Sequence, residues 1–124
     1  MKRDPDLIRN IMLVIEAAPH GELVRLPQLQ GYDSLTVHVH VGLMLEAGLL
    51  RTPFPDRRPH QRWVILRLSW AGYDLLDQIR DPKIWRTVKH GAARLGNWSL
   101  DTLGGLAKAA ILSHAAAMGV PISG

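Results

Sequence analysis

The chain has 124 residues, of which 47% are hydrophobic and 21% charged, and this balance is ordinary for one globular domain with a real core. It contains no cysteine, which excludes a disulfide framework and a thiolate metal site and fits a reducing compartment, so we expect a cytoplasmic protein. The N-terminus lacks the apolar run of a secretion signal, and charged residues interrupt the apolar region 100–118. We therefore expect neither secretion nor a membrane span.

The formal net charge of +4 is concentrated in one stretch of the sequence. Residues 51–67 hold five arginines and one aspartate, whereas the other 107 residues hold ten basic and ten acidic side chains, which cancel. Such a local excess is typical of a surface that meets an anionic partner, and the alternative is a solvated arginine-rich loop.

The first predicted helix covers residues 5–18. Asp4 can cap it, Pro5 suits its first position, and apolar residues recur at helical spacing until Pro19 and Gly21. The following "ELVRL" predicts a short strand, and "PQLQGYD" predicts a loop or a single helical turn.

The stretch "TVHVHVGLMLEAGLL", residues 36–50, is ambiguous because it begins with a polar/apolar alternation. As a strand it could place two histidines on one face, but residues 37, 41, 44 and 47 form a helical apolar stripe, followed by Gly48 as a C-cap. We predict a helix over 34–47 with Ser34 as its cap. His38 and His40 are then about 200° apart, so they cannot share a metal; we expect His40 at the edge of the buried face and His38 free to meet solvent or a ligand.

Two apolar runs, "LLRT" and "RWVILRL", flank the basic, proline-rich "PFPDRRPHQ" and predict a β-hairpin. Two further helices follow from Trp70, with a bend near Asp81, and we expect Trp70, Tyr73 and Trp85 to belong to the core. Helix, helix and basic hairpin in this order are typical of a winged helix-turn-helix. The predicted fold is therefore mainly α with a small β-hairpin (α+β), a winged helix-turn-helix extended by C-terminal helices.

A last helix is predicted from Leu100 to about Met118, with Ser99 as its cap. Little of its circumference is polar, so it must be buried in its own domain or against another chain. We divide the chain into residues 1–94, the winged-helix domain with its following helices, and residues 95–124, the apolar C-terminal helix. Self-association as a homodimer or another oligomer would use an apolar set on this helix: Leu103, Leu106, Ala110, Ile111 and Met118.

Several segments resemble a family of small winged-helix proteins of unknown function found in phages, prophages and bacterial genomes. The similar segments are "MKRDPDLIRNIM", "EAGLL", "LSWAGYDLLDQIRDPKIW" with Lys89 after it, and "SLD" at the last helix. The resemblance implies a winged-helix fold and matches His40 and Glu46 to the second main helix. This sequence departs from the family pattern at Gly42, which costs about 1 kcal/mol relative to alanine in a helix, and in its proline-rich loop.

No arrangement of residues in the sequence supplies a nucleophile with a base, paired catalytic carboxylates or a phosphate loop, so we expect neither an enzyme nor a bound cofactor or metal. The favoured hypothesis is DNA binding, in which the 34–47 helix approaches the bases and the hairpin holds phosphates. The alternative is a protein-interaction or assembly module that acts through the C-terminal helix without DNA. The predicted nucleic-acid-binding residues are Ser34, Thr36, His38, His40, Arg51, Arg57, Arg58, His60 and Arg62.

Overall fold

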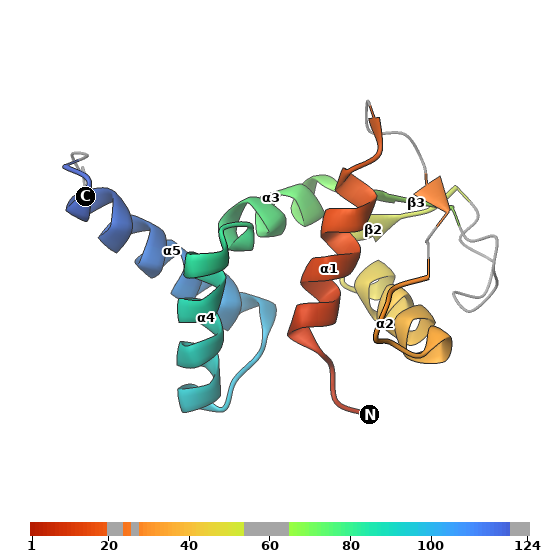
Figure 1. The fold of residues 1–124 in the computed structure, drawn as a ribbon, viewed down its shortest axis with the longest axis horizontal. Coiled ribbons are helices and arrows are strands. Elements are labelled where there is room, and N and C mark those ends of the chain that lie inside the picture. The colour runs from red at the N-terminus through yellow and green to blue at the C-terminus, as the bar shows by residue number, and fades with distance from the viewer. Residues whose placement is uncertain (20–23, 26–27, 54–64, 120–124) are drawn as a thin grey trace. The chain divides into compact units, whose positions relative to one another are not determined.

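The computed structural model describes residues 1–19, 24–25, 28–53 and 65–119. The fold is mainly helical with a small antiparallel sheet, as the sequence predicted (Figure 1). The elements are α1 (Pro5–Glu16), β1 (Val24–Arg25), α2 (Ser34–Glu46), β2 (Leu50–Arg51), β3 (Ile65–Leu68), α3 (Trp70–Ile79), α4 (Pro82–Leu95) and α5 (Leu100–Ala117). They form two compact units, Met1–Leu76 and Asp77–Gly124, with α3 crossing the boundary.

Helix α1 begins as predicted at an aspartate followed by proline. The Asp4 carboxylate accepts a hydrogen bond from the backbone N–H of Leu7 at 3.2 Å, and Pro5 occupies the first position, where its missing N–H costs nothing. The helix ends at Glu16, two residues before the predicted end. Its buried side packs on α2 and β3 and consists of Leu7, Ile11, Met12 and Ile15.

The ambiguous stretch is a helix, α2, and not a strand. Three residues of the predicted stripe, Val37, Val41 and Met44, are buried. The predicted cap was wrong by one residue: Asp33 caps the helix, because its Oδ1 accepts from the Leu35 N–H at 3.2 Å, and Ser34 is the first helical residue. Gly48 then adopts the left-handed conformation, with φ of 77°, just past the helix end.

Strand β3 is the centre of the sheet and pairs antiparallel with β1 on one side and β2 on the other. Leu50 lies opposite Leu68, and Arg51 lies opposite Arg67. Burial alternates along β3, with Leu66 and Leu68 buried and Arg67 exposed. Both hairpin strands therefore lie within the segments that the sequence predicted, and β2 is shorter than predicted.

The turn from β3 into α3 is held by a close backbone approach. Ser69 Oγ accepts from the Gly72 N–H at 3.0 Å and donates to the Gly48 carbonyl oxygen, while the Ser69 N–H donates to the Leu49 carbonyl at 3.0 Å. A Cβ at Gly72 would overlap the Leu49 carbonyl oxygen. Only glycine therefore fits at this position without a backbone shift.

The expectation that Trp70 belongs to the core was wrong, because its side chain is 83% exposed. It is the first residue of α3, and the buried side of this helix is formed by Leu75, Leu76 and Ile79. Tyr73 is also partly exposed, at 37%. The same expectation was correct for Trp85, which is buried.

The second unit is built on α4 and α5, which pack against each other (Figure 1). Asp81 caps α4 by accepting from the N–H groups of Lys83 and Ile84 at 2.7 and 3.2 Å. Ser99 caps α5, as predicted, by accepting from the Thr102 N–H at 3.2 Å. Helices α4 and α5 belong to one compact unit, and the predicted division after residue 94 stays a prediction.

We predict that Gly72→Ala lowers the free energy of unfolding by about 3 kcal/mol, because the added methyl group forces Leu49 and the β3–α3 turn apart. Urea denaturation followed by circular dichroism measures this loss. The matched control is Gly105→Ala in α5, where a Cβ meets no atom within 4 Å and should add up to about 1 kcal/mol of stability. Equal effects of the two substitutions would contradict the close approach at Gly72.

Candidate nucleic-acid interface

Two arginines lie side by side on the solvent face of the hairpin. Arg51 of β2 and Arg67 of β3 are partners in the antiparallel register, and both are exposed. Arg67 Nη1 also donates to the carbonyl oxygen of Leu68 at 3.2 Å, which restrains its side chain near the strand. Like charges directly opposite each other repel and destabilise the strand pair, and an anion bound between them offsets this repulsion. The pair is therefore suited to a phosphate or another oxyanion.

The rest of the predicted basic set, Arg57, Arg58, His60 and Arg62, lies outside the described residues. In the sequence these residues fall between Arg51 and Arg67. The two described arginines are thus at the two ends of the arginine-rich stretch.

The exposed side of α2 is more apolar than a typical DNA-reading helix. Leu35 and Val39, one helical turn apart, are 60% and 40% exposed. Ser34 is exposed, whereas Thr36 is half-buried and its hydroxyl donates to Asp33 Oδ2 at 3.4 Å. His38 is half-buried and has a partner of its own within the chain.

His40 was wrongly placed among the residues that contact DNA bases. It is 1% exposed, and both ring nitrogens are used inside the chain. The Asp4 N–H donates to Nε2 at 2.9 Å, so the ring proton resides on Nδ1, which donates to the Thr36 carbonyl oxygen at 2.8 Å. His40 therefore ties the start of α1 to α2 and does not reach a ligand.

We predict that His40→Ala lowers the free energy of unfolding by about 3 kcal/mol, because it leaves a cavity and an unpaired Asp4 N–H. Chemical denaturation checks this value. Val39→Ala, at the neighbouring exposed position, should change stability by less than about 1 kcal/mol. A His40→Ala protein as stable as the wild type would show that the bridge contributes little.

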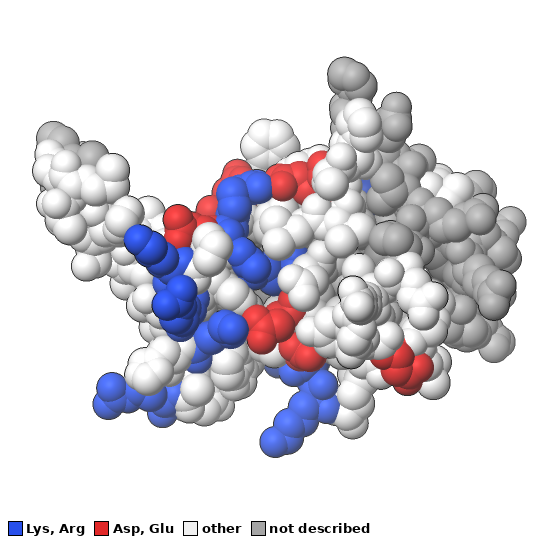
Figure 2. Space-filling view, in the orientation of Figure 1, with Lys and Arg blue, Asp and Glu red and all other residues white. Residues whose placement is uncertain are grey.

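A second basic surface, which the sequence analysis missed, lies on α4. This helix contains four basic residues and no acidic one, and Figure 2 shows lysine and arginine side chains gathered over it. One of them, Lys89, has its Nζ 5.7 Å from the centre of the Trp85 ring. The sequence holds the signal, because residues 82–95 counted by themselves have a net charge of +4. When all residues outside 51–67 are counted together, acidic residues elsewhere cancel this charge. The members of this surface are Lys83, Arg86, Lys89 and Arg94.

The predicted self-association set on α5 divides into buried and exposed members. Leu103 is only 5% exposed, so its inclusion was wrong. Leu106 and Ala110 are half-buried, and a Cβ at Gly91 of α4 would lie 3.1 Å from Leu106 Cδ2. Ile111 and Met118 are 38% and 68% exposed and remain available to another chain.

Within the described ranges, no three histidine, aspartate or glutamate residues gather where they could hold a metal ion. In the same part of the chain, no helix combines the length and apolar character needed to cross a membrane.

The described residues form a mainly helical protein with a small antiparallel sheet. The profile of the family described as "Hypothetical protein (DUF2513)" matches residues 2–97. An uncharacterized protein of Haemophilus influenzae (strain ATCC 51907 / DSM 11121 / KW20 / Rd) is 36% identical over 90 residues, which cover 72% of this chain and 76% of that protein. No solved structure matches.

The chain belongs to the DUF2513 family. This membership agrees with the resemblance to a family of unknown function. The match ends at residue 97, so it covers α1 to α4 and leaves α5 outside.

Proposed function

We propose that the chain is a non-enzymatic winged-helix DNA-binding protein, of the kind used as a phage- or prophage-type regulator. The element order α1-β1-α2-β2-β3 and the strand order β1-β3-β2 support it, because a winged helix pairs its first strand with the last and follows its second main helix with a hairpin. In this proposal α2 is the recognition helix and the segment between β2 and β3 is the wing.

The observation that carries the proposal is the exposed pair Arg51 and Arg67 at the ends of the arginine-rich stretch. Their register places two guanidinium groups on one face of the hairpin, and the intervening sequence adds three arginines and no more than one carboxylate. Guanidinium groups bind phosphate oxygens in a bidentate manner. The wing would therefore supply most of the affinity.

Helix α2 would contribute little sequence discrimination. It contains no arginine, lysine, asparagine or glutamine, so the usual bidentate contacts with guanine and adenine are absent. The hydroxyls of Ser34 and Thr36 offer single hydrogen bonds, and the exposed Leu35 and Val39 offer apolar contacts to thymine methyl groups. We therefore expect binding dominated by the phosphate backbone.

We predict that the protein binds a labelled random duplex with an affinity that falls with salt. Contacts with about four phosphates give a slope of about −3.6 in a plot of log affinity against log salt concentration. Arg51→Gln/Arg67→Gln removes two of these contacts and should reduce the slope to about −1.8. Fluorescence anisotropy across a salt series measures both slopes.

The matched control is Arg86→Gln/Lys108→Gln, which removes two exposed positive charges from the second unit and leaves the hairpin intact. Its slope should equal that of the wild type. If the slope of the control falls as much as that of the hairpin variant, binding depends on net charge or on the basic surface of α4, and the proposed interface is wrong. If the wild type fails to bind at low salt, DNA binding itself is wrong.

A second candidate function is assembly through α5, with or without DNA. It is favoured by the C-terminal half of this helix together with its C-cap residue, because Ile111, Leu112 and Met118 are 38%, 40% and 68% exposed. Apolar side chains in such number on one short segment are typical of a contact surface. Ile111 and Met118 are seven residues apart and share one side of the helix.

We predict that the wild-type chain self-associates and that Ile111→Glu shifts it to the monomer, because a carboxylate cannot be buried in an apolar contact without a partner. Sedimentation velocity measures the change. Ser113→Glu adds the same charge about 200° around the helix and should leave the oligomer intact. A wild-type chain that sediments as a monomer at high concentration would refute this candidate.

A further inference from the structure

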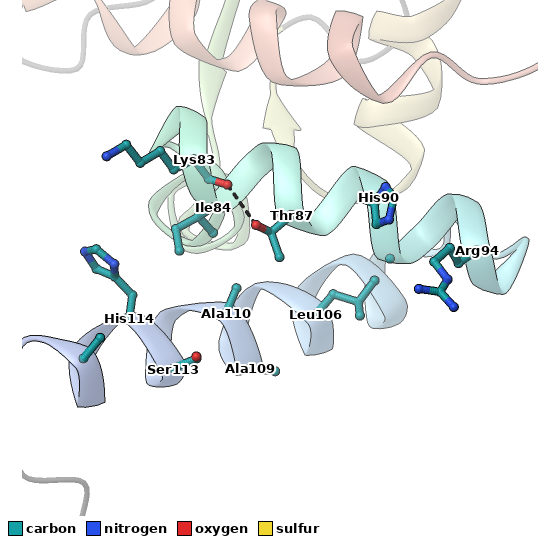
Figure 3. A pocket seen from close by; sticks show the side chains of 12 residues that line it. Lys83, Ile84, Thr87, His90, Arg94, Leu106, Ala109, Ala110, Ser113 and His114 are labelled. Carbon is teal, nitrogen blue, oxygen red and sulfur yellow. Dashed lines mark hydrogen bonds between the residues drawn. The ribbon is translucent and has the colours of Figure 1, made fainter.

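A groove runs between α4 and α5 within the second unit (Figure 3). Its volume is about 640 Å³, and each helix lines it with residues that recur every three or four positions. The floor is apolar and comprises Ile84, Gly91, Leu106 and Ala110. Most residues along the rim are exposed, so the groove is open to solvent.

Every charged residue that lines this groove is positive. Lys83 and His114 lie at one end and Arg94 with His90 at the other, as Figure 3 shows, and no carboxylate is among the lining residues. In the described part of the chain neither Lys83 nor Arg94 forms an ion pair. The groove thus combines an apolar floor with a cation at each end.

The nearby carboxylate of Asp81 is already engaged in capping α4. Hydrogen bonds from the backbone N–H groups of Ile84 and Lys83 hold the pKa of Asp81 below its usual value, with smaller contributions from the charges of His114 and Lys83. Asp81 is therefore ionised, and although it does not line the groove, its charge offsets part of the positive charge of Lys83 and His114 at that end.

The separation of the two ends indicates the shape of the occupant. Lys83 and Arg94 are eleven positions apart on α4, which corresponds to about 16 Å along the helix at 1.5 Å per residue. A small anion would reach one cation only, whereas a helix of about three turns reaches both. The narrow apolar floor suits the apolar side of such a helix, in the manner of helix-in-groove recognition.

We propose that the α4–α5 groove binds an acidic amphipathic helix of a partner protein. The apolar side of that helix covers Ile84, Leu106 and Ala110, and its carboxylates meet Lys83 at one end and Arg94 at the other. The groove belongs to the second unit and shares no residue with the hairpin arginines, so this inference does not rest on DNA binding.

The test uses the full chain and a fluorescein-labelled peptide of about 16 residues, alanine-rich for helicity, with leucines along one side and glutamates eleven positions apart. The comparison peptide has lysine at every glutamate position. Fluorescence anisotropy should show that the glutamate peptide binds at least about tenfold more tightly than the lysine peptide. Lys83→Glu/Arg94→Glu should abolish that preference.

The control Arg86→Glu/Lys108→Glu makes the same charge change at exposed residues outside the groove and should alter affinity by less than about threefold. Ala110→Glu, which obstructs the floor without touching either end, should also prevent binding. Circular dichroism verifies that each variant is folded.

Three results would overturn the proposal. Equal affinity for the glutamate and lysine peptides would show that charge does not select the partner. If the control Arg86→Glu/Lys108→Glu weakened binding as much as Lys83→Glu/Arg94→Glu, the attraction would come from the net charge of the protein and not from the groove. Displacement of the peptide by duplex DNA would assign the groove to nucleic acid. Because the hairpin variant Arg51→Gln/Arg67→Gln should bind the peptide normally, a failure of the DNA proposal is distinguishable from a failure of this one.

Discussion

The first unit depends on the close approach of Gly72 to the Leu49 backbone. Ser69 accepts from the Gly72 N–H, donates to the Gly48 carbonyl and, through its own N–H, bonds the Leu49 carbonyl. These bonds fix three things together: where α2 ends, where β2 begins, and where β3 gives way to α3. Because β2 has only two residues, its register with β3 depends on this junction, and the register places Arg51 opposite Arg67.

His40, in the middle of α2, has a comparable role. Its buried imidazole accepts from the Asp4 N–H, at the start of α1, and donates to the Thr36 carbonyl oxygen in α2. These two hydrogen bonds fix the distance between α1 and α2. It also explains why a histidine occupies a position in the apolar stripe: a leucine there would leave the Asp4 N–H without its acceptor. The stripe is thus completed by a polar residue whose hydrogen bonds are satisfied internally.

The two units present different chemistry. The hairpin of the first unit offers arginines on a sheet face, which suits phosphate groups, whereas the groove of the second unit offers an apolar floor between separated cations. In the two proposals, the first unit holds DNA and the second unit holds a partner protein. The family match ends at residue 97, so α5, which forms one wall of the groove, lies beyond the matched region. The proposed partner would therefore bind only those chains that also carry such a C-terminal helix.

The sequence by itself determined the helices, their order and most of their ends, because local signals act there: Asp4 with Pro5, Asp81 with Pro82, Ser99, and glycine at position 48. It also identified α2 as a helix from its apolar stripe. Only the tertiary structure decided which side chains are exposed. Trp70 proved to be on the surface and His40 in the interior. Periodicity does not reveal a hydrogen-bond partner 36 residues away, such as Asp4 for His40, or a groove between two helices. Such features arise from packing between segments, and no local pattern encodes them.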